Sequence, residues 1–309
     1  MNLRPMLVLL AVAALPGCAG FGNPHNWIPG VVEAGRQVEL VQEGFQFTEG
    51  PVGSAEGGLY FTDLRASRVH YLDPRGKLSV YREPTGEMNG LALTAKGELV
   101  GIESGGKRLS RFNPEGPRTE LTRGDGVHPL VAPNDLIVDA KGGIYFTDPH
   151  NRPVVAGRKH QIYYLPPGEL KAIVVDESMK RPNGLTLTLD GKRLIVADTV
   201  DHVLPVFDVG PDGRLSNRRA YAKLLDIKEG QDSGADGIAI DREGRLFVTC
   251  VTGVQVFDPR GQYLGNIQVP RKPTNVAFAG PGKRTLYITA REGLYRIPTL
   301  TQGPDRLGK

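Results

Sequence analysis

Cysteine is scarce in this sequence of 309 residues, with only Cys18 and Cys250. Cys250 lies in the apolar run LFVTCV, where a cysteine is normally a small buried side chain rather than a nucleophile. Because Cys18 belongs to the N-terminal leader, we expect no disulfide within the folded domain.

Basic clusters, metal-type histidine pairs and long helical patterns are also lacking. The formal net charge is +4, and the positive residues are spread along the chain without runs or interleaved aromatics. This distribution argues against a nucleic-acid-binding surface. With 40 glycines and 24 prolines, the composition instead favours a turn-rich β protein.

The only apolar stretch of note runs from Met6 to Leu15, after Arg4. It is too short to span a bilayer and is typical of a secretory signal peptide. The sequence LPGC that ends at Cys18 resembles a bacterial lipobox, whose cysteine becomes the lipidated first residue of the mature chain. The alternative is a plain signal peptide cleaved nearby.

We therefore interpret residues 1–18 as a signal segment with a lipidated Cys18, and residues 19–36 as a tether. The expected location is the bacterial cell envelope, on the periplasmic face of the outer membrane, with a secreted or periplasmic protein as the alternative. The lipid on Cys18 would be the membrane anchor.

One unit recurs along the rest of the chain. It consists of a polar residue, a short alternating apolar run, a glycine-containing turn and a second apolar run. Successive copies start 39 to 53 residues apart, which is typical of one four-stranded blade of a β-propeller. The six copies begin at Glu49, Asn89, Asn134, Asn183, Asp236 and Asn275.

Six copies predict an all-β, six-bladed β-propeller over residues 37–300, with a C-terminal tail at 301–309. The opening run QVELVQEGFQF is expected to supply a strand to the last blade and close the ring, which removes open sheet edges. Two separate β-sandwiches are the alternative fold.

The polar residue that opens each copy is Glu, Asp or Asn all six times. In a propeller the first strand of each blade lines the central channel, so these six residues should form a ring. Carboxylate and amide oxygens without His or Cys are the ligands of a hard cation. One Ca²⁺ fits best, with Mg²⁺, Mn²⁺ or Zn²⁺ as alternatives.

Four motifs occur in order with blade spacing: FTEGP from 47, APNDLIVDAKGGIYFTDP from 132, RPNGLTLTLDGKRLIVAD from 181 and GADGIAIDREGRLFV from 234. Together they resemble the senescence marker protein, gluconolactonase and luciferin-regenerating enzyme family, in its bacterial gluconolactonase-like branch. The resemblance implies a six-bladed propeller with one catalytic divalent cation at the channel mouth, acting on a small lactone.

By motif, the resemblance implies that Glu49, Asn183 and Asp236 bind the metal, and that Asn134 binds metal or substrate. Asn89 and Asn275 match no element with an implied catalytic role. The cation would polarise the carbonyl of a cyclic ester. Asp236 would act either as the base that activates water or as a nucleophile.

Further candidates for substrate contact are Glu103, His128 and His150. Two departures from the family pattern bear on the sugar: Ala132 occupies the place of an arginine in animal relatives, and HNRPVVAG follows the TDP element instead of an aromatic-glycine pair. Three aspartates at one register, Asp63, Asp148 and Asp198, suggest a structural cap at the far end of the blade.

Two other functions are consistent with the same ring. A propeller at the envelope could be a binding or scaffold module with a structural calcium ion. A related chemistry, such as organophosphate hydrolysis or a lyase-type condensation, is the third hypothesis, although the lyase version would not need the carboxylate ligands.

Overall fold

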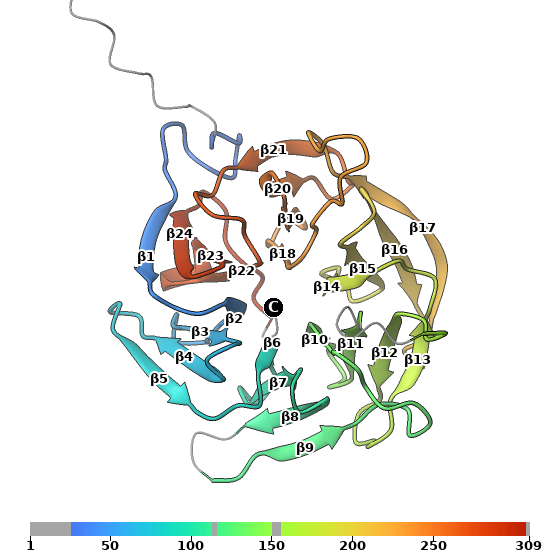
Figure 1. Ribbon diagram of the computed structural model, residues 1–309. Coiled ribbons are helices and arrows are strands. Elements are labelled where there is room, and N and C mark those ends of the chain that lie inside the picture. Colours follow the sequence, from blue (N-terminus) through green and yellow to red (C-terminus); the bar gives the residue numbers. More distant parts are fainter. Residues whose placement is uncertain (1–25, 113–115, 150–155, 307–309) are drawn as a thin grey trace, which may run out of the picture.

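The chain forms a ring of six four-stranded antiparallel sheets around a central axis (Figure 1). The computed structural model describes residues 26–112, 116–149 and 156–306. The predicted six-bladed propeller is therefore confirmed. Within these ranges, no helix has the length and apolarity needed to cross a membrane.

The blades follow the chain in order, and within each blade the strands run from the innermost outward. Blade 1 contains β2 (Thr48–Gly53), β3 (Leu59–Asp63), β4 (Arg68–Leu72) and β5 (Leu78–Arg82). Blade 2 contains β6 (Met88–Leu93), β7 (Leu99–Glu103), β8 (Arg108–Phe112) and β9 (Thr119–Thr122). Blade 3 contains β10 (Leu136–Val138), β11 (Ile144–Asp148), β12 (Gln161–Leu165) and β13 (Ile173–Asp176).

The second half repeats this arrangement. Blade 4 contains β14 (Pro182–Leu187), β15 (Arg193–Asp198), β16 (Val203–Val209) and β17 (Leu215–Lys223). Blade 5 contains β18 (Ile238–Ile240), β19 (Leu246–Cys250), β20 (Gly253–Phe257) and β21 (Tyr263–Ile267). Blade 6 contains β22 (Asn275–Ala279), β23 (Thr285–Ala290) and β24 (Gly293–Pro298), with the short 3₁₀ helix η1 (Pro281–Lys283) between β22 and β23.

The ring closes through the N-terminal strand β1 (Glu39–Glu43), which is the outermost strand of blade 6. It pairs antiparallel with β24, so that Glu39 lies opposite Arg296. This confirms the predicted closure, which joins the two ends of the domain and leaves blade 6 with four strands like the others.

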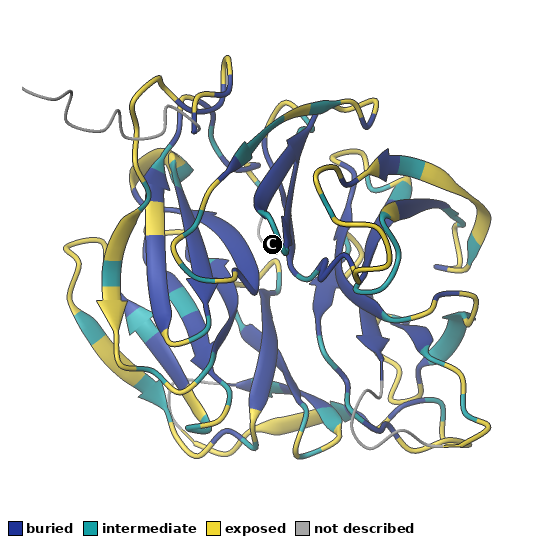
Figure 2. Ribbon diagram, turned by 45° about the horizontal axis from the view of Figure 1, so that its top comes forward, coloured by how far each residue is buried: buried dark blue, intermediate teal, exposed yellow. Residues whose placement is uncertain are grey.

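The hydrophobic core lies between neighbouring blades. Inner strands are buried along both faces, whereas outer strands such as β17 are largely exposed (Figure 2). Between blades 2 and 3, for example, Ile102 and Phe146 belong to one buried cluster, and Phe146 stacks on Tyr163 at 5.1 Å between ring centroids. Cys250 is fully buried in the cluster of blades 4 and 5, as its apolar surroundings predict.

Residues 26–36, which belong to the segment predicted as a tether, pack against the propeller. Ile28, Val31 and Val32 are fully buried in a cluster with side chains of blades 5 and 6. The Asn26 side chain accepts a hydrogen bond from the Gln268 amide at 2.9 Å. This part of the segment is therefore an ordered extension of the domain.

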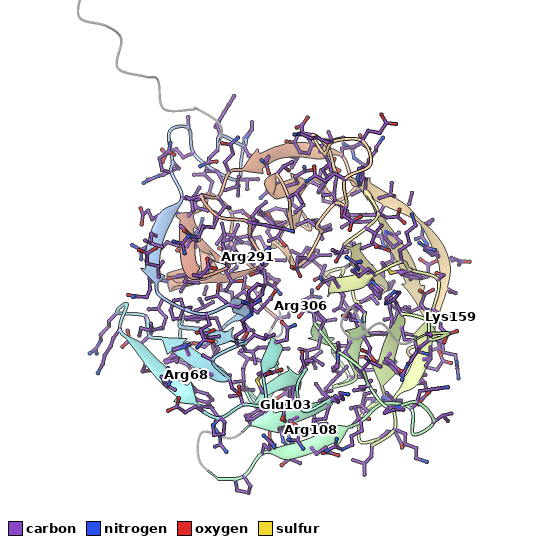
Figure 3. The ribbon with its side chains drawn as sticks, in the orientation of Figure 1. Arg68, Glu103, Arg108, Lys159, Arg291 and Arg306 are labelled. Carbon is purple, nitrogen blue, oxygen red and sulfur yellow. The ribbon has the colours of Figure 1, made fainter. Side chains whose placement is uncertain are left out.

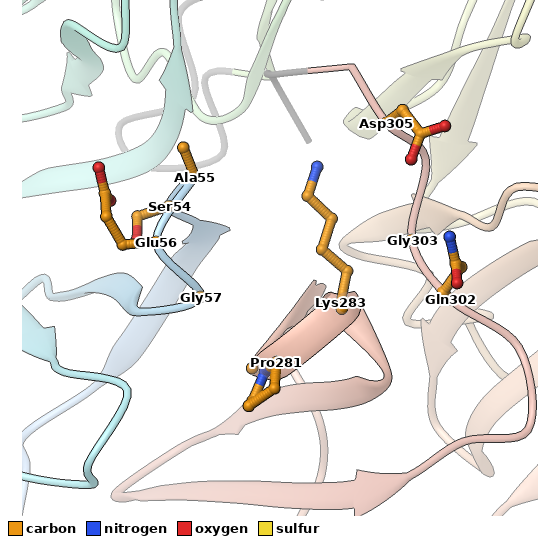
Figure 4. A pocket seen from close by; sticks show the side chains of 11 residues that line it. Ser54, Ala55, Glu56, Gly57, Pro281, Lys283, Gln302, Gly303 and Asp305 are labelled. Carbon is orange, nitrogen blue, oxygen red and sulfur yellow. The ribbon is translucent and has the colours of Figure 1, made fainter.

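The C-terminal segment after β24 crosses the channel at the end opposite the starts of the inner strands. Lys283 donates to the carbonyls of Pro304 and Arg306, at 2.7 and 3.0 Å, and extends between the 54–57 turn and residues 302–305 (Figure 4). Arg306 lies near the axis (Figure 3) and donates to the carbonyls of Leu187 and Thr188. Burial lowers the pKa of Arg306 to about 10. The tail thus closes the channel floor.

Candidate metal and active site

The six polar residues of the repeat lie at one end of the six inner strands, which is the mouth opposite the tail. Glu49, Asn89, Asn183 and Asn275 lie at the first or second residue of their strands. Asn134 and Asp236 each come two residues before β10 and β18. The first four are buried, and Asn134 and Asp236 are half-buried. The predicted ring of oxygen-bearing side chains is therefore present at one mouth of the channel.

Neighbouring inner strands bond to each other at this mouth. The amide of Gly90 donates to the carbonyl of Asn134 at 2.9 Å, and the amide of Gly184 donates to the carbonyl of Asp236 at 3.0 Å. These bonds join blade 2 to blade 3 and blade 4 to blade 5. They fix the spacing of the ring residues through the backbone.

The glycine after a ring residue serves this close approach. A Cβ on Gly184 would lie 2.1 Å from the Asp236 carbonyl oxygen, and one on Gly50 would lie 2.1 Å from the Asn89 carbonyl oxygen. Gly184 lies within β14 and has no positive φ. Gly184 therefore does not serve a turn, and its lack of a side chain lets the next blade come close.

In blade 3 the residue after the ring position is Asp135 instead of glycine, and its side chain joins the site. Asp135 is fully buried. The side-chain amide of Asn275 donates to Glu49 at 3.1 Å and lies 3.4 Å from an Asp135 carboxylate oxygen. Sequence reasoning missed Asp135, although the departure from glycine at this register was the available signal.

The side-chain NH₂ of Asn275 thus contacts two buried carboxylates, those of Glu49 and Asp135. The negative charges of Glu49 and Asp135 oppose each other, and burial strengthens that repulsion. A divalent cation at the ring would offset it. Asn275 turns its NH₂ toward the carboxylates while its oxygen accepts from the Val276 amide at 2.9 Å, so it positions the carboxylates and does not present an oxygen to the channel.

Two ring amides present oxygens that suit a metal. The Oδ1 atoms of Asn89 and Asn183 are buried and make no hydrogen bond within the described part of the chain. Asn183 donates its NH₂ to Thr199 at 3.1 Å, which leaves the oxygen directed elsewhere. Since a buried polar atom normally has a partner, these oxygens fit a hard cation.

The four predicted metal ligands, Glu49, Asn134, Asn183 and Asp236, offer only oxygens, and two of the four are amides. Across residues 26–112, 116–149 and 156–306, no three His, Cys, Asp or Glu side chains are grouped as metal ligands. Zn²⁺ normally takes nitrogen or sulfur ligands, whereas Ca²⁺ accepts carboxylate and amide oxygens together. The residues present therefore fit Ca²⁺ better than Zn²⁺.

Three aspartates hold the segments that enter the ring. The carboxylate of Asp198 accepts the backbone amides of Lys180 and Arg181 at 2.9 and 3.1 Å. These residues come three and two positions before Asn183. Asp63 accepts in the same way from Gln46 and Phe47 before Glu49, and Asp148 from Val131 and Ala132 before Asn134.

The predicted structural role of these aspartates is confirmed, but their predicted place at the far end is wrong. Thr48 lies opposite Asp63, and Pro182 lies opposite Asp198. The antiparallel pairing returns the second strand to the channel mouth, so each aspartate lies beside the ring. We call these three residues the entry clamps.

Asp236 is held differently, because Cys250 occupies the clamp register in blade 5. The backbone amide of Asp236 donates to the Thr249 carbonyl at 3.0 Å, and the backbone carbonyl of Asp236 accepts from the Gly184 amide. The preceding turn is fixed by the Ser233 hydroxyl, which accepts from the Ala235 amide and donates to the Asp198 carbonyl. Burial raises the pKa of the Cys250 thiol.

Glu103 occupies the clamp register in blade 2 and does not join the ring. Its carboxylate is fully buried, and one oxygen lies 2.9 Å from Arg108 and 3.1 Å from Arg118. The other oxygen accepts from the Ser110 hydroxyl. The ion pair with Glu103 raises the pKa of Arg108. All of these contacts lie within blade 2, so the Glu103 carboxylate binds side chains in the interior of this blade.

The other predicted contacts lie apart from the ring. His128 is exposed and pairs with Asp125 at 3.3 Å, in the connection between blades 2 and 3. His150 and Cys18 lie outside the described residues. The structure thus places Glu49, Asn134, Asn183 and Asp236 at the same mouth of the channel and adds Asp135 and Asn275 beside Glu49.

Comparisons with known proteins agree with this fold. Residues 47–292 match the family described as the SMP-30/Gluconolactonase/LRE-like region. A gluconolactonase of Zymomonas mobilis is 26% identical over 88% of this chain and 84% of its own length. A 6-deoxy-6-sulfogluconolactonase of Pseudomonas putida is 32% identical over 78% of this chain and 82% of its own. The solved structure of a Xanthomonas campestris gluconolactonase has a TM-score of 0.78 at 29% identity, covering 91% and 98% of the two chains.

Proposed function

Because the chain belongs to the SMP-30/gluconolactonase/LRE-like family, we propose that it is a lactonase that depends on a divalent cation. The observation that carries the proposal is the set of oxygens at one channel mouth, where the buried amide oxygen of Asn183 lacks a hydrogen-bond partner within the described chain. Relatives named gluconolactonases align along most of the chain, which supports a sugar lactone as substrate.

Glu49, Asn183 and Asp236 would hold the cation, with Asn134 as a fourth ligand or a substrate contact. Ca²⁺ suits this oxygen set best. When bound, such a cation supplies polarisation of the lactone carbonyl and stabilisation of the charge that develops on its oxygen. The Asn275 amide donates to Glu49 and holds that carboxylate in place.

The chain's own contribution to the reaction centres on Asp236. Its backbone is fixed on both sides, by Thr249 and by Gly184, so its half-buried carboxylate has little freedom at the mouth. The Asp236 carboxylate would accept a proton from the attacking water. The lactone ring would open as its ester bond breaks, and the leaving oxygen would be protonated to a hydroxyl. The alternative role, direct attack by the carboxylate, would pass through an acyl-enzyme.

Purified mature protein should release acid from the δ-lactone of gluconic acid, and a chelator should abolish this activity. Asp236→Asn keeps the shape of the side chain and should lower kcat by about 10² to 10⁴. Asp190→Asn, in an exposed turn of blade 4, is the matched control and should keep full activity. Turnover that survives metal removal would contradict the proposal.

Measurements with and without Ca²⁺ also distinguish a lactonase from a binding module with a structural ion. If Ca²⁺ raises the melting temperature while no lactone is hydrolysed, the ring is structural. Asn183→Ala should weaken Ca²⁺ binding by calorimetry in either case, because it removes a donor oxygen. Only the enzyme requires that Asp236→Asn and the chelator both remove activity.

We also propose that the protein is exported and anchored by a lipid on Cys18. The proposal rests on the apolar leader and the LPGC sequence. In a bacterial host, wild-type protein should incorporate labelled fatty acid and fractionate with membranes. Cys18→Ser should abolish both, and an unlabelled wild-type protein would indicate a plain signal peptide instead.

A further inference from the structure

Two arginines without carboxylate partners lie beside the ring on the blade 1 and blade 6 side of the mouth. The guanidinium carbons of Arg65 and Arg291 both lie 5.3 Å from the ring centroid of Phe47. Among the described residues, neither arginine forms an ion pair. Two nearby acids, Glu43 and Glu292, pair with Arg271 instead.

Phe47 directly precedes β2 and lies two residues before Glu49. The Phe47 carbonyl accepts from the Leu64 amide at 2.9 Å, which extends the β2–β3 ladder by one residue. Side chains two residues apart on a strand share a face. We therefore expect the Phe47 side chain and the two arginines that contact it beside Glu49 at the channel mouth.

Arg291 is tied to the same place by its backbone. Its carbonyl accepts both the amide and the hydroxyl of Thr48, at 2.7 and 3.0 Å. Thr48 is the residue before Glu49, and Arg291 lies in the connection between β23 and β24 of blade 6. The side chain of Arg291 therefore starts within one residue of a proposed metal ligand.

The backbone conformation of Arg291 is one that disfavours a side chain. It is the first of two residues that join β23 to β24, and its φ is 55°. This hairpin position favours glycine, because a side chain is disfavoured at positive φ. An arginine here adds backbone strain and contributes no ion pair to the described part of the fold.

We infer that Arg65, Arg291 and Phe47 form an anion subsite, so that the preferred lactone carries a negatively charged group on the carbon chain away from the ester. The inference rests on the proposed lactonase function. Guanidinium groups bind carboxylate, phosphate and sulfonate groups through paired hydrogen bonds, and Phe47 supplies an apolar surface against which they are held.

The test compares three substrates: the δ-lactone of gluconic acid, its 6-phosphate, and the 1,4-lactone of glucaric acid, which carries a carboxylate. Wild-type kcat/KM should be higher for the charged lactones, and this preference should weaken as salt screens the arginines. The ratio of phosphate to carboxylate turnover distinguishes the two anions.

Arg291→Gly removes the cation and suits the backbone, so a loss of fold cannot explain its effect. Arg291→Gly and Arg65→Gln should each lower the ratio of charged to neutral kcat/KM by roughly tenfold, as expected for a hydrogen bond to a charged group. Arg75→Gln, with the same charge change in an exposed turn of blade 1 at the opposite end, should leave the ratio unchanged.

A wild-type ratio near one, or a ratio that both variants preserve, would overturn the anion subsite while leaving the lactonase intact. If no lactone is hydrolysed, calorimetric titration decides the inference separately. Wild type should then bind 6-phosphogluconate more tightly than gluconate, and Arg291→Gly should abolish the difference. Equal binding of the two acids would refute the subsite.

Discussion

Asp198→Ala removes the entry clamp of blade 4 and should destabilise the fold and the metal site together. Asp198 is 1% exposed, and its carboxylate accepts four backbone amides, from Lys180, Arg181, Val200 and Asp201, at 2.9 to 3.3 Å. Each donor left without its acceptor costs about 1–3 kcal/mol. Because these residues are half-buried or exposed, water can reach some of the amides, and the low end applies.

The expected loss is therefore about 3–4 kcal/mol in the free energy of unfolding, a large part of the roughly 5–15 kcal/mol of a typical domain. Urea unfolding followed by circular dichroism measures it. Since the two clamped amides lead directly into Asn183, Ca²⁺ affinity measured by calorimetry should also fall in the variant that still folds, Asp198→Asn, which keeps the shape but turns an NH₂ toward the amides.

Asp190→Ala is the matched control in the same blade. Asp190 also accepts a backbone amide, from Lys192 at 3.1 Å, but in the exposed turn at the tail end of the blade. It should cost about 1 kcal/mol or less and leave Ca²⁺ affinity unchanged. If Asp198→Asn binds Ca²⁺ as tightly as wild type, the clamp does not position Asn183 and the reasoning is refuted.

Three further predictions concern other parts of the propeller. Gly184→Ala places a Cβ 2.1 Å from the Asp236 carbonyl, so it should destabilise the fold by about 1–3 kcal/mol in urea titration and abolish lactone turnover. Arg306→Ala removes donors to two buried carbonyls in the channel floor and should lower stability by about 2 kcal/mol with kcat unchanged. Burial lowers the pKa of His70 below 6.5, so below that pH the unfolded chain binds a proton that the fold excludes, and stability should fall; His70→Phe should flatten this slope between pH 7 and 5.

Each of these has an outcome that would contradict it. Gly210→Ala, in a turn of blade 4 where the nearest atom belongs to a side chain that can rotate, should be tolerated; equal damage from both glycine variants would exclude the blade-contact explanation. A loss of turnover in Arg306→Ala without unfolding would place the tail in the reaction. An unchanged pH slope in His70→Phe would assign the acid sensitivity elsewhere.

The fold and the register of the six polar residues could be predicted from local sequence patterns. Each blade is built from local patterns, with alternating apolar residues and glycine turns repeated at nearly constant intervals. Such patterns indicate the strands and the number of blades, because every copy of the repeat forms the same strands. The polar residue that opens each copy could therefore be assigned to the channel from the repeat alone. The apolar run ahead of the first copy likewise indicated the closing strand.

The groups that surround the six polar residues depend on contacts between distant parts of the chain. The amide of Asn275 reaches Glu49 across 226 positions of sequence, and no local pattern encodes such a contact. The same holds for Asp135, for the antiparallel return that puts Asp198 beside Asn183, and for the tail that brings Arg306 to the channel floor. These contacts depend on ring closure, because closure brings the first blade against the last and encloses a channel with two different ends.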